Sequence, residues 1–140
     1  MRGKSRNVIL LFGVAALLTA LGCAATHYVP KGEITCPADI TWNVAPQAEV
    51  SSFSCTVGEF KKEPAVIFKV GVKNVSDKAQ RFRVQIFLLD EGKAVGHLVP
   101  RTGKPPVLKP GQEEVVSLPA PKTTKLPKKL EVILKTISIG

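Results

Sequence analysis

Helical periodicity, catalytic motifs and histidine are all scarce in this chain of 140 residues. No segment repeats apolar residues at a helical spacing for long enough to predict a helix, which excludes a helical bundle. The motifs GxSxG and HExxH and a glycine-rich phosphate loop are absent, so the signatures of common hydrolases, zinc proteases and nucleotide-binding enzymes are missing. His27 and His97 are the only two histidines, and neither stands in a segment that would hold it beside a nucleophile. We therefore expect no catalytic activity.

Ligands for a metal ion or a nucleic acid are equally few. Asp90 and Glu91 lack the further oxygen ligands that a calcium site needs at close intervals, and two histidines are too few to favour a zinc site. The basic segment 122–129 contains no aromatic side chain on which a base could stack. We expect no cofactor, no bound metal and no nucleic-acid partner.

The longest apolar run in the chain is an export signal by its composition. Residues 8–22 are almost entirely apolar, and a positive region precedes them at Arg2, Lys4 and Arg6. A membrane-spanning helix needs about 20 apolar residues, and no stop-transfer pattern follows the run. The sequence therefore predicts a cleaved signal peptide over residues 1–22.

The end of this run, residues 20–23 (ALGC), resembles the lipobox of bacterial lipoproteins, with Ala20 where leucine is commoner. The resemblance implies that Cys23 receives a diacylglyceryl group and a further acyl chain, and two or three chains hold a protein durably on a membrane. In Gram-negative bacteria an aspartate after the cysteine retains such proteins at the inner membrane. Ala24 stands there instead, which implies the outer membrane, facing the periplasm. The alternative is ordinary cleavage after Ala24 or Ala25, which would release a soluble domain.

The predicted mature chain has the length of one domain. It carries 17 basic and 11 acidic residues, a net charge of +6. Residues 23–33 mix small, polar, proline and glycine residues without periodicity, so we expect a mobile lipidated tether before a domain over residues 34–140. The basic excess is either a solvated surface or a contact for anionic partners. The candidate contact residues are Lys122, Lys125, Lys128 and Lys129, together with Arg101 and Lys104.

Cys36 and Cys55 remain after Cys23 is assigned to lipid. In an oxidising compartment a disulfide is the default, and a loop of about 20 residues closed in this way stabilises a domain by roughly 3 kcal/mol. A metal site would need more ligands, and a redox pair favours the closer CxxC spacing.

Alternating apolar and polar residues predict strands along most of this domain. The clearest covers residues 65–75, and a second from Gln80 to Leu88 is expected to return beside it as an antiparallel partner. Further strands are expected at residues 40–44, 53–57, 113–118 and 130–139, with an edge strand and crossing loop over residues 94–112.

Turn residues separate these segments. Asp90 to Lys93 is typical of a hairpin with Gly92 at a positive φ, and Pro110 with Gly111 predicts a type II turn. We expect Trp42 to pack over the predicted disulfide, with an exposed binding role as the alternative.

About seven short strands and one disulfide predict an all-β fold, a single immunoglobulin-like antiparallel β-sandwich. Three isoleucines do not fit this pattern, because they fall on the face expected to be wet: Ile133, Ile137 and Ile139.

The segment from Phe68 to Leu118 is similar to the FxLYD-type immunoglobulin-like domains of prokaryotic secreted proteins and to small YcfL-like periplasmic lipoproteins. The shared features are the strand ending at Asn74 before a polar turn, Asp90 before Gly92, and Pro110 with Gly111 before another strand. The family signature Phe, Leu, Tyr, Asp is matched at two of four positions, where this chain has Ile86, Leu88, Leu89 and Asp90. The resemblance implies an envelope sandwich with no defined chemistry.

These observations predict a lipid-anchored interaction module of the bacterial cell envelope, without catalysis, whose partner is another envelope protein. The alternative is a binder of anionic envelope polymer or lipid head groups through the basic loop 122–129.

Overall fold

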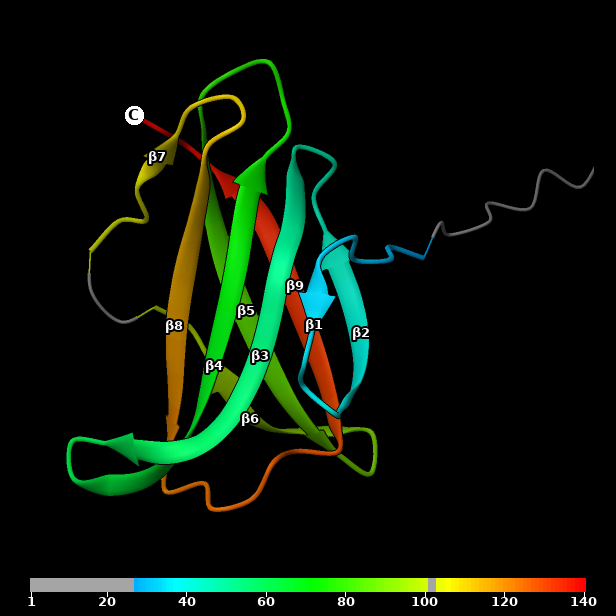
Figure 1. Ribbon diagram of the computed structural model, residues 1–140, viewed down its shortest axis with the longest axis vertical. Coiled ribbons are helices and arrows are strands. Elements are labelled where there is room, and N and C mark those ends of the chain that lie inside the picture. Colours follow the sequence, from blue (N-terminus) through cyan, green and yellow to red (C-terminus); the bar gives the residue numbers. More distant parts are fainter. Residues whose placement is uncertain (1–26, 101–102) are drawn as a thin grey trace, which may run out of the picture.

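The computed structural model describes residues 27–100 and 103–140, which form two β-sheets packed face to face (Figure 1). One sheet has the strand order β1-β3-β4-β8, and the other has the order β2-β9-β5-β6 with β7 paired to β5. The strands are β1 (Glu33–Ile34), β2 (Asp39–Val44), β3 (Ala48–Phe60), β4 (Glu63–Asn74), β5 (Gln80–Asp90), β6 (Lys93–Leu98), β7 (Val107–Leu108), β8 (Glu113–Pro121) and β9 (Lys129–Ile137).

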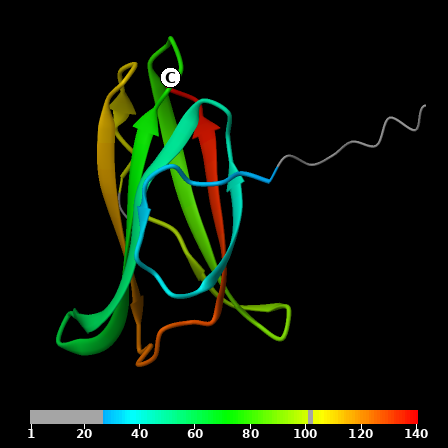
Figure 2. The ribbon, with the colours of Figure 1, turned by 45° about the vertical axis from the view of Figure 1, so that its right-hand side comes forward.

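The predicted fold class, an all-β immunoglobulin-like sandwich, is confirmed, although the described residues form nine strands where about seven were expected. Figure 2 shows the two layers after a turn about the vertical axis. In this part of the chain no helix has the length and apolar character needed to cross a membrane. The predicted signal peptide over residues 1–22, and Cys23 with it, lie outside the described residues.

The core lies between the sheets because each long strand alternates apolar and polar side chains. Along β4, Val66, Phe68 and Val70 are fully buried, while Lys69 is exposed on the outer face. Strands β5 and β9 cover the same core with Phe82, Val84, Ile86, Leu130, Val132 and Leu134. Full burial of a side chain of this size stabilises the fold by about 1.5–3 kcal/mol, so this core holds the two sheets together.

The expectation that the strand from Gln80 returns beside the strand at residues 65–75 is wrong. Strand β4 pairs with β3 and β8, whereas β5 pairs with β6, β7 and β9 in the opposite sheet. Alternation shows which face of a strand is buried, but strands in either sheet of a sandwich can bury that face in the same core. The chain crosses between the sheets at residues 75–79, where the Asn74 side chain donates to the carbonyl oxygens of Lys78 and Leu108.

The sandwich is antiparallel, as expected, apart from two edge pairs. Strand β1 pairs with β3 in parallel, and β2 pairs with β9 in parallel. Strands β2 and β9 run the same way because both begin at one end of the sandwich, where the backbone nitrogen of Asp39 donates to the carbonyl oxygen of Lys128 at 2.8 Å. The N-terminal segment thus supplies an edge strand to each sheet.

The predicted disulfide between Cys36 and Cys55 is present, with a Cα–Cα distance of 4.9 Å. Each cysteine lies two residues beyond the parallel pair Ile34 and Phe53, so the bridge continues the register of β1 against β3. Both cysteines are buried. Trp42 is half-buried against the core, and its ring meets the ring of Phe53 edge-on at a centroid distance of 5.3 Å.

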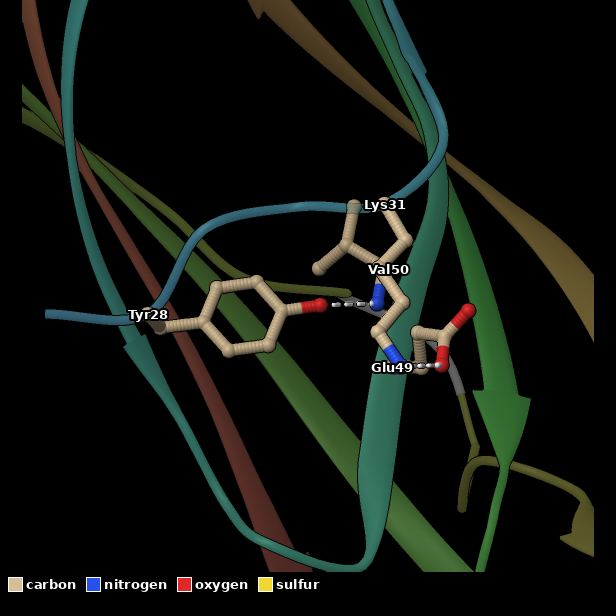
Figure 3. A network of polar contacts seen from close by, with 4 residues as sticks. All are labelled: Tyr28, Lys31, Glu49 and Val50. Atoms are coloured by element: carbon tan, nitrogen blue, oxygen red, sulfur yellow. Dashed lines mark hydrogen bonds and ion pairs between the residues drawn. The ribbon is translucent and has the colours of Figure 1, made fainter. Parts of the chain in front are cut away.

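The described part of the predicted tether, residues 27–33, does not stand away from the domain. The Tyr28 hydroxyl accepts a hydrogen bond of 2.8 Å from the backbone nitrogen of Val50, and Lys31 lies 3.9 Å from the Glu49 carboxylate (Figure 3). Gly32 passes so close to Ser51 that a side chain there would clash with the Ser51 backbone. We call residues 28–34 the N-terminal strap, because they cross from β2 to β3 and end in β1.

Candidate functional site

Three connections lie at one end of the sandwich, at the bottom of Figure 1: the β3–β4 hairpin, the β8–β9 loop and the β5–β6 turn. The hairpin and the loop are in contact, because the backbone nitrogen of Lys122 donates to the carbonyl oxygen of Pro64 at 2.9 Å. Six exposed lysines from these two connections form what we call the lysine end: Lys61, Lys62, Lys122, Lys125, Lys128 and Lys129.

The four lysines predicted as a contact site therefore lie at one end of the molecule, three in the β8–β9 loop and Lys129 at the first position of β9. Lys104 does not join them: it lies in the connection from β6 to β7, and β7 pairs with the start of β5, whereas the end of β5 lies at the lysine end. Arg101 lies outside the described residues.

The charges of the lysine end are not neutralised by ion pairs. Within residues 27–100 and 103–140 the one ion pair joins Lys31 to Glu49, at the other half of the sandwich. Glu59 and Glu63 flank the hairpin tip on β3 and β4, yet neither lies within ion-pair distance of a lysine. An exposed lysine without a partner keeps its full charge available to a ligand.

The lysine end has an unusual backbone conformation. Lys61 and Lys62 form the two-residue hairpin turn with φ of 51° and 63°, and Lys122 has φ of 60°. Turns with two positive φ angles strongly favour Asn-Gly, since a side chain is crowded in this region. The Lys61 ammonium also lies over the Phe60 ring, 5.4 Å from its centroid. These lysines occupy positions where local folding preference favours other residues.

An apolar groove of about 360 Å³ lies beside the lysine end, between the edge strands β6 and β8. We call it the proline groove. Its lining is Phe60, Lys61, His97, Leu98, Val99, Pro100, Ser117, Leu118, Pro119 and Pro121. The His97 ring is held flat against the ring of Phe87 on the neighbouring strand, with 4.2 Å between centroids. The groove has the size and mainly apolar lining of a site for a peptide segment or small ligand.

A smaller cavity of about 260 Å³ lies under the N-terminal strap and is lined by Tyr28, Val44, Pro46 and Glu49 among others. Burial raises the pKa of the Tyr28 phenol above its ordinary value, and the charge of Glu49 raises this pKa further, while the hydrogen bond from Val50 acts in the opposite direction. The strap closes one open side of the sandwich, and the proline groove lies on the other.

Sequence reasoning missed Lys61 and Lys62 as part of the basic site, and it missed the proline groove. The run Phe60, Lys61, Lys62, Glu63 lies between two alternating segments, but it contains none of the glycine or asparagine that indicates a tight hairpin. The groove forms from strands far apart in the sequence, so no local motif could have indicated it.

The fold and these surfaces define a class: a single disulfide-bonded β-sandwich with a basic end and an apolar groove. Among the residues that the structure describes, no three His, Cys, Asp or Glu side chains gather as a metal site would require. No protein-family model matches the chain, and no curated protein and no solved structure matches it either.

Proposed function

We propose that this chain is a lipid-anchored protein of the bacterial cell envelope, acylated at Cys23, whose sandwich is a non-catalytic interaction module for another envelope protein. Three features support the proposed localisation: the export signal over residues 1–22, the lipobox-like end at Cys23 and the resemblance to small periplasmic lipoproteins. The disulfide between Cys36 and Cys55 fits an oxidising compartment. Ala24 favours the outer membrane, facing the periplasm.

The proline groove is the observation on which the proposed adapter role depends. It is open to solvent between two edge strands and offers Leu98, Val99 and Pro119 to an apolar segment of the partner. Strand pairing with the rim of β8 is hindered at Pro119 and Pro121, because proline has no backbone N–H to donate. We therefore expect side-chain docking into the groove, with at most a short stretch of strand pairing.

Site-specific photo-crosslinking in intact cells tests this role. A crosslinker at Val99, in the groove, should give one discrete protein adduct, whereas a crosslinker at the exposed Val75, outside the groove, should give none. The adduct should persist when Lys122, Lys125 and Lys128 become glutamine. The same adduct from both positions, or none from Val99, would contradict the adapter role.

The proposed anchor is tested separately. Mass spectrometry of the mature N-terminus should find a diacylglyceryl group and an acylated amine on Cys23, and Cys23→Ser should move the protein from the membrane to the soluble fraction. An unmodified N-terminus that still carries Met1, in protein recovered from the cytosol, would overturn the proposed localisation.

The lysine end supports a second candidate function, binding of an anionic envelope polymer or lipid head groups. The unpaired, exposed state of its lysines favours this candidate. Binding to anionic vesicles or cell-wall polymer should fall steeply from low to high ionic strength and should largely disappear when the four predicted lysines become glutamine. Salt-independent binding would argue against it.

A further inference from the structure

We propose that the β3–β4 hairpin tip forms part of a contact site for an anionic envelope polymer, and that this site faces away from the membrane that holds the lipid anchor. The orientation rests on the proposed acylation of Cys23, whereas the polymer contact does not. The site consists of the predicted basic loop together with Lys61 and Lys62. Its ligand is one of the two named for the second candidate function, a polymer bearing phosphate or carboxylate groups.

The backbone of the hairpin is the first argument. Four residues other than glycine have positive φ in the described chain, and three of them are lysines of the lysine end: Lys61, Lys62 and Lys122. The fourth, Glu91, lies in the neighbouring β5–β6 turn. Lysine is poorly suited to this conformation, so turn formation does not account for its presence. Residues whose type opposes the conformational preference of their backbone position are candidates for a functional role.

The choice of lysine is the second argument. The β3–β4 hairpin tip and the β8–β9 loop carry lysines but no arginine, and none of these lysines has an ion-pair partner within the described residues. Lysine is a compact charge on a flexible stem, whereas arginine offers a rigid fork that recognises one carboxylate or phosphate with two bonds. A set of mobile point charges suits a polymer with repeated charges better than a single anion in a fixed pose.

The N-terminal strap is the third argument, because it fixes where the chain enters the sandwich. Tyr28 is docked at Val50, near the start of β3, whereas β3 ends ten residues later at Phe60, about 30 Å along the strand and next to Lys61 of the lysine end. Four residues separate Cys23 from Tyr28, so the two Cα atoms are five residue steps apart and at most about 18 Å from each other when the chain is extended. In Figure 1 the strap enters at the right of the upper half, and the lysine end is at the bottom. The tether is shorter than the distance from Tyr28 to the lysine end, so the domain cannot stand with its lysines pointing at the anchoring membrane. The lysines therefore face the other side of the compartment.

Binding to reconstituted protein tests the polymer contact. The full chain would be processed in a bacterial host, purified with the lipid on Cys23 verified by mass, and inserted into phosphatidylcholine vesicles. Fluorescent polyphosphate and polyglutamate are the probes. Lys61→Gln with Lys62→Gln should weaken binding at least threefold, and so should Lys125→Gln with Lys128→Gln. The matched control, Lys69→Gln with Lys78→Gln, removes the same charge at exposed positions elsewhere and should leave binding unchanged.

The orientation needs its own measurement. Fluorophores placed at Val29 and at Thr124, both exposed, report on the strap and on the lysine end. Spin-labelled lipid head groups should quench the label at Val29 and spare the label at Thr124. Equal quenching of the two labels would overturn the orientation.

The remaining outcomes distinguish a failure of the polymer contact from a failure of the proposed anchor. Unchanged polymer binding after the hairpin substitutions would overturn the role of Lys61 and Lys62, and an equal loss in the control pair would reduce the site to overall charge. If mass spectrometry finds no lipid on Cys23, the proposed anchor fails and the orientation fails with it, while polymer binding by the soluble chain still decides the contact site.

Discussion

The hydroxyl of Tyr28 lies 2.8 Å from the backbone nitrogen of Val50 and accepts its hydrogen bond, across 22 residues of sequence. This bond satisfies an N–H at the edge of β3 beyond the two residues that β1 pairs. The Tyr28 ring also lies 6.3 Å from the ring of Trp42, so one side chain joins the strap to β2 and β3. The first described residues are thus part of the folded domain.

Tyr28→Phe should lower the free energy of unfolding by about 1 kcal/mol, because it removes the acceptor for Val50 while keeping the ring beside Trp42. Urea unfolding of residues 24–140 at neutral pH measures this. Tyr28→Ala is the comparison and should lower stability further, since the ring contact is also lost. Equal stability of the phenylalanine variant and the natural chain would contradict a structural role for the bond.

The raised pKa of Tyr28 predicts how this difference depends on pH. The folded state favours the neutral phenol, so its stabilisation is complete below the ordinary tyrosine pKa of about 10 and is lost as the pH rises through the higher folded pKa. The natural chain should therefore lose stability in alkali relative to Tyr28→Phe. Tyr28 is the chain's only tyrosine, so its phenolate absorbance should titrate later in the folded protein than in urea.

Removal of the disulfide should lower the free energy of unfolding by roughly 3 kcal/mol, because the bridge closes a loop with a sequence separation of 19. The double variant Cys36→Ala with Cys55→Ala avoids leaving a buried unpaired thiol. Thermal unfolding with and without reductant measures the effect: reductant should bring the natural chain close to the variant and leave the variant unchanged. If the natural chain unfolds at the same temperature as the variant, both with and without reductant, the bridge contributes no stability.

Asn74→Ala should destabilise the domain by about 3 kcal/mol. Asn74 is fully buried, its amide donates to the carbonyl oxygens of Lys78 and Leu108, and its oxygen accepts from Ser76. Alanine would remove this donor from the buried carbonyl oxygen of Leu108 and the acceptor of the Ser76 backbone N–H, and it would leave a cavity where the amide was. The comparison Ser76→Ala removes a half-buried hydroxyl that donates to Asn74 and Lys78, but the Ser76 backbone N–H still donates to Asn74, so stability should fall by only about 1 kcal/mol. Chemical unfolding that ranks the two variants equally would contradict this account.

The strand segments were predictable because burial of one face leaves a period of two in the sequence. The expected strand at residues 65–75 matches β4, and the one from Gln80 matches β5. The turn predictions are confirmed as well: Gly92 and Gly111 have φ of 76° and 79°. These features depend only on neighbouring residues, which the sequence displays directly.

The pairing of strands was not predictable in the same way. Strands β4 and β5 both bury one apolar face, and nothing local places them in different sheets. Strand β1 has only two residues and depends on the close approach of Gly32 to Ser51. The outward-facing position of Ile133 also depends on strand pairing. Strand β9 is an inner strand, so Asn43 and Gln85 flank this side chain and leave it half-buried.

Only part of the basic site could be predicted from the sequence, because its two segments come together only through strand pairing. A run of lysines between prolines indicates a charged loop by itself, so residues 122–129 were identified. The hairpin lies beside that loop because β4 pairs with β8, and the bond from Lys122 to Pro64 continues this pairing. The Lys-Lys turn of the hairpin carries no turn signal. A spatial cluster built from two connections can be read only from the fold.

Lys61→Asn with Lys62→Gly separates the folding role of the hairpin tip from its charge. The pair Asn-Gly suits a turn with two positive φ angles, here 51° and 63°, so the variant should gain about 1 kcal/mol in the free energy of unfolding. If the lysines serve a polymer contact, the same variant should bind polyphosphate at least threefold more weakly. Lys61→Gln with Lys62→Gln is the control, since it removes the charge without relieving the backbone and should lose binding without a gain in stability. A variant that is more stable and binds as tightly as the natural chain would leave the two lysines without a role in binding.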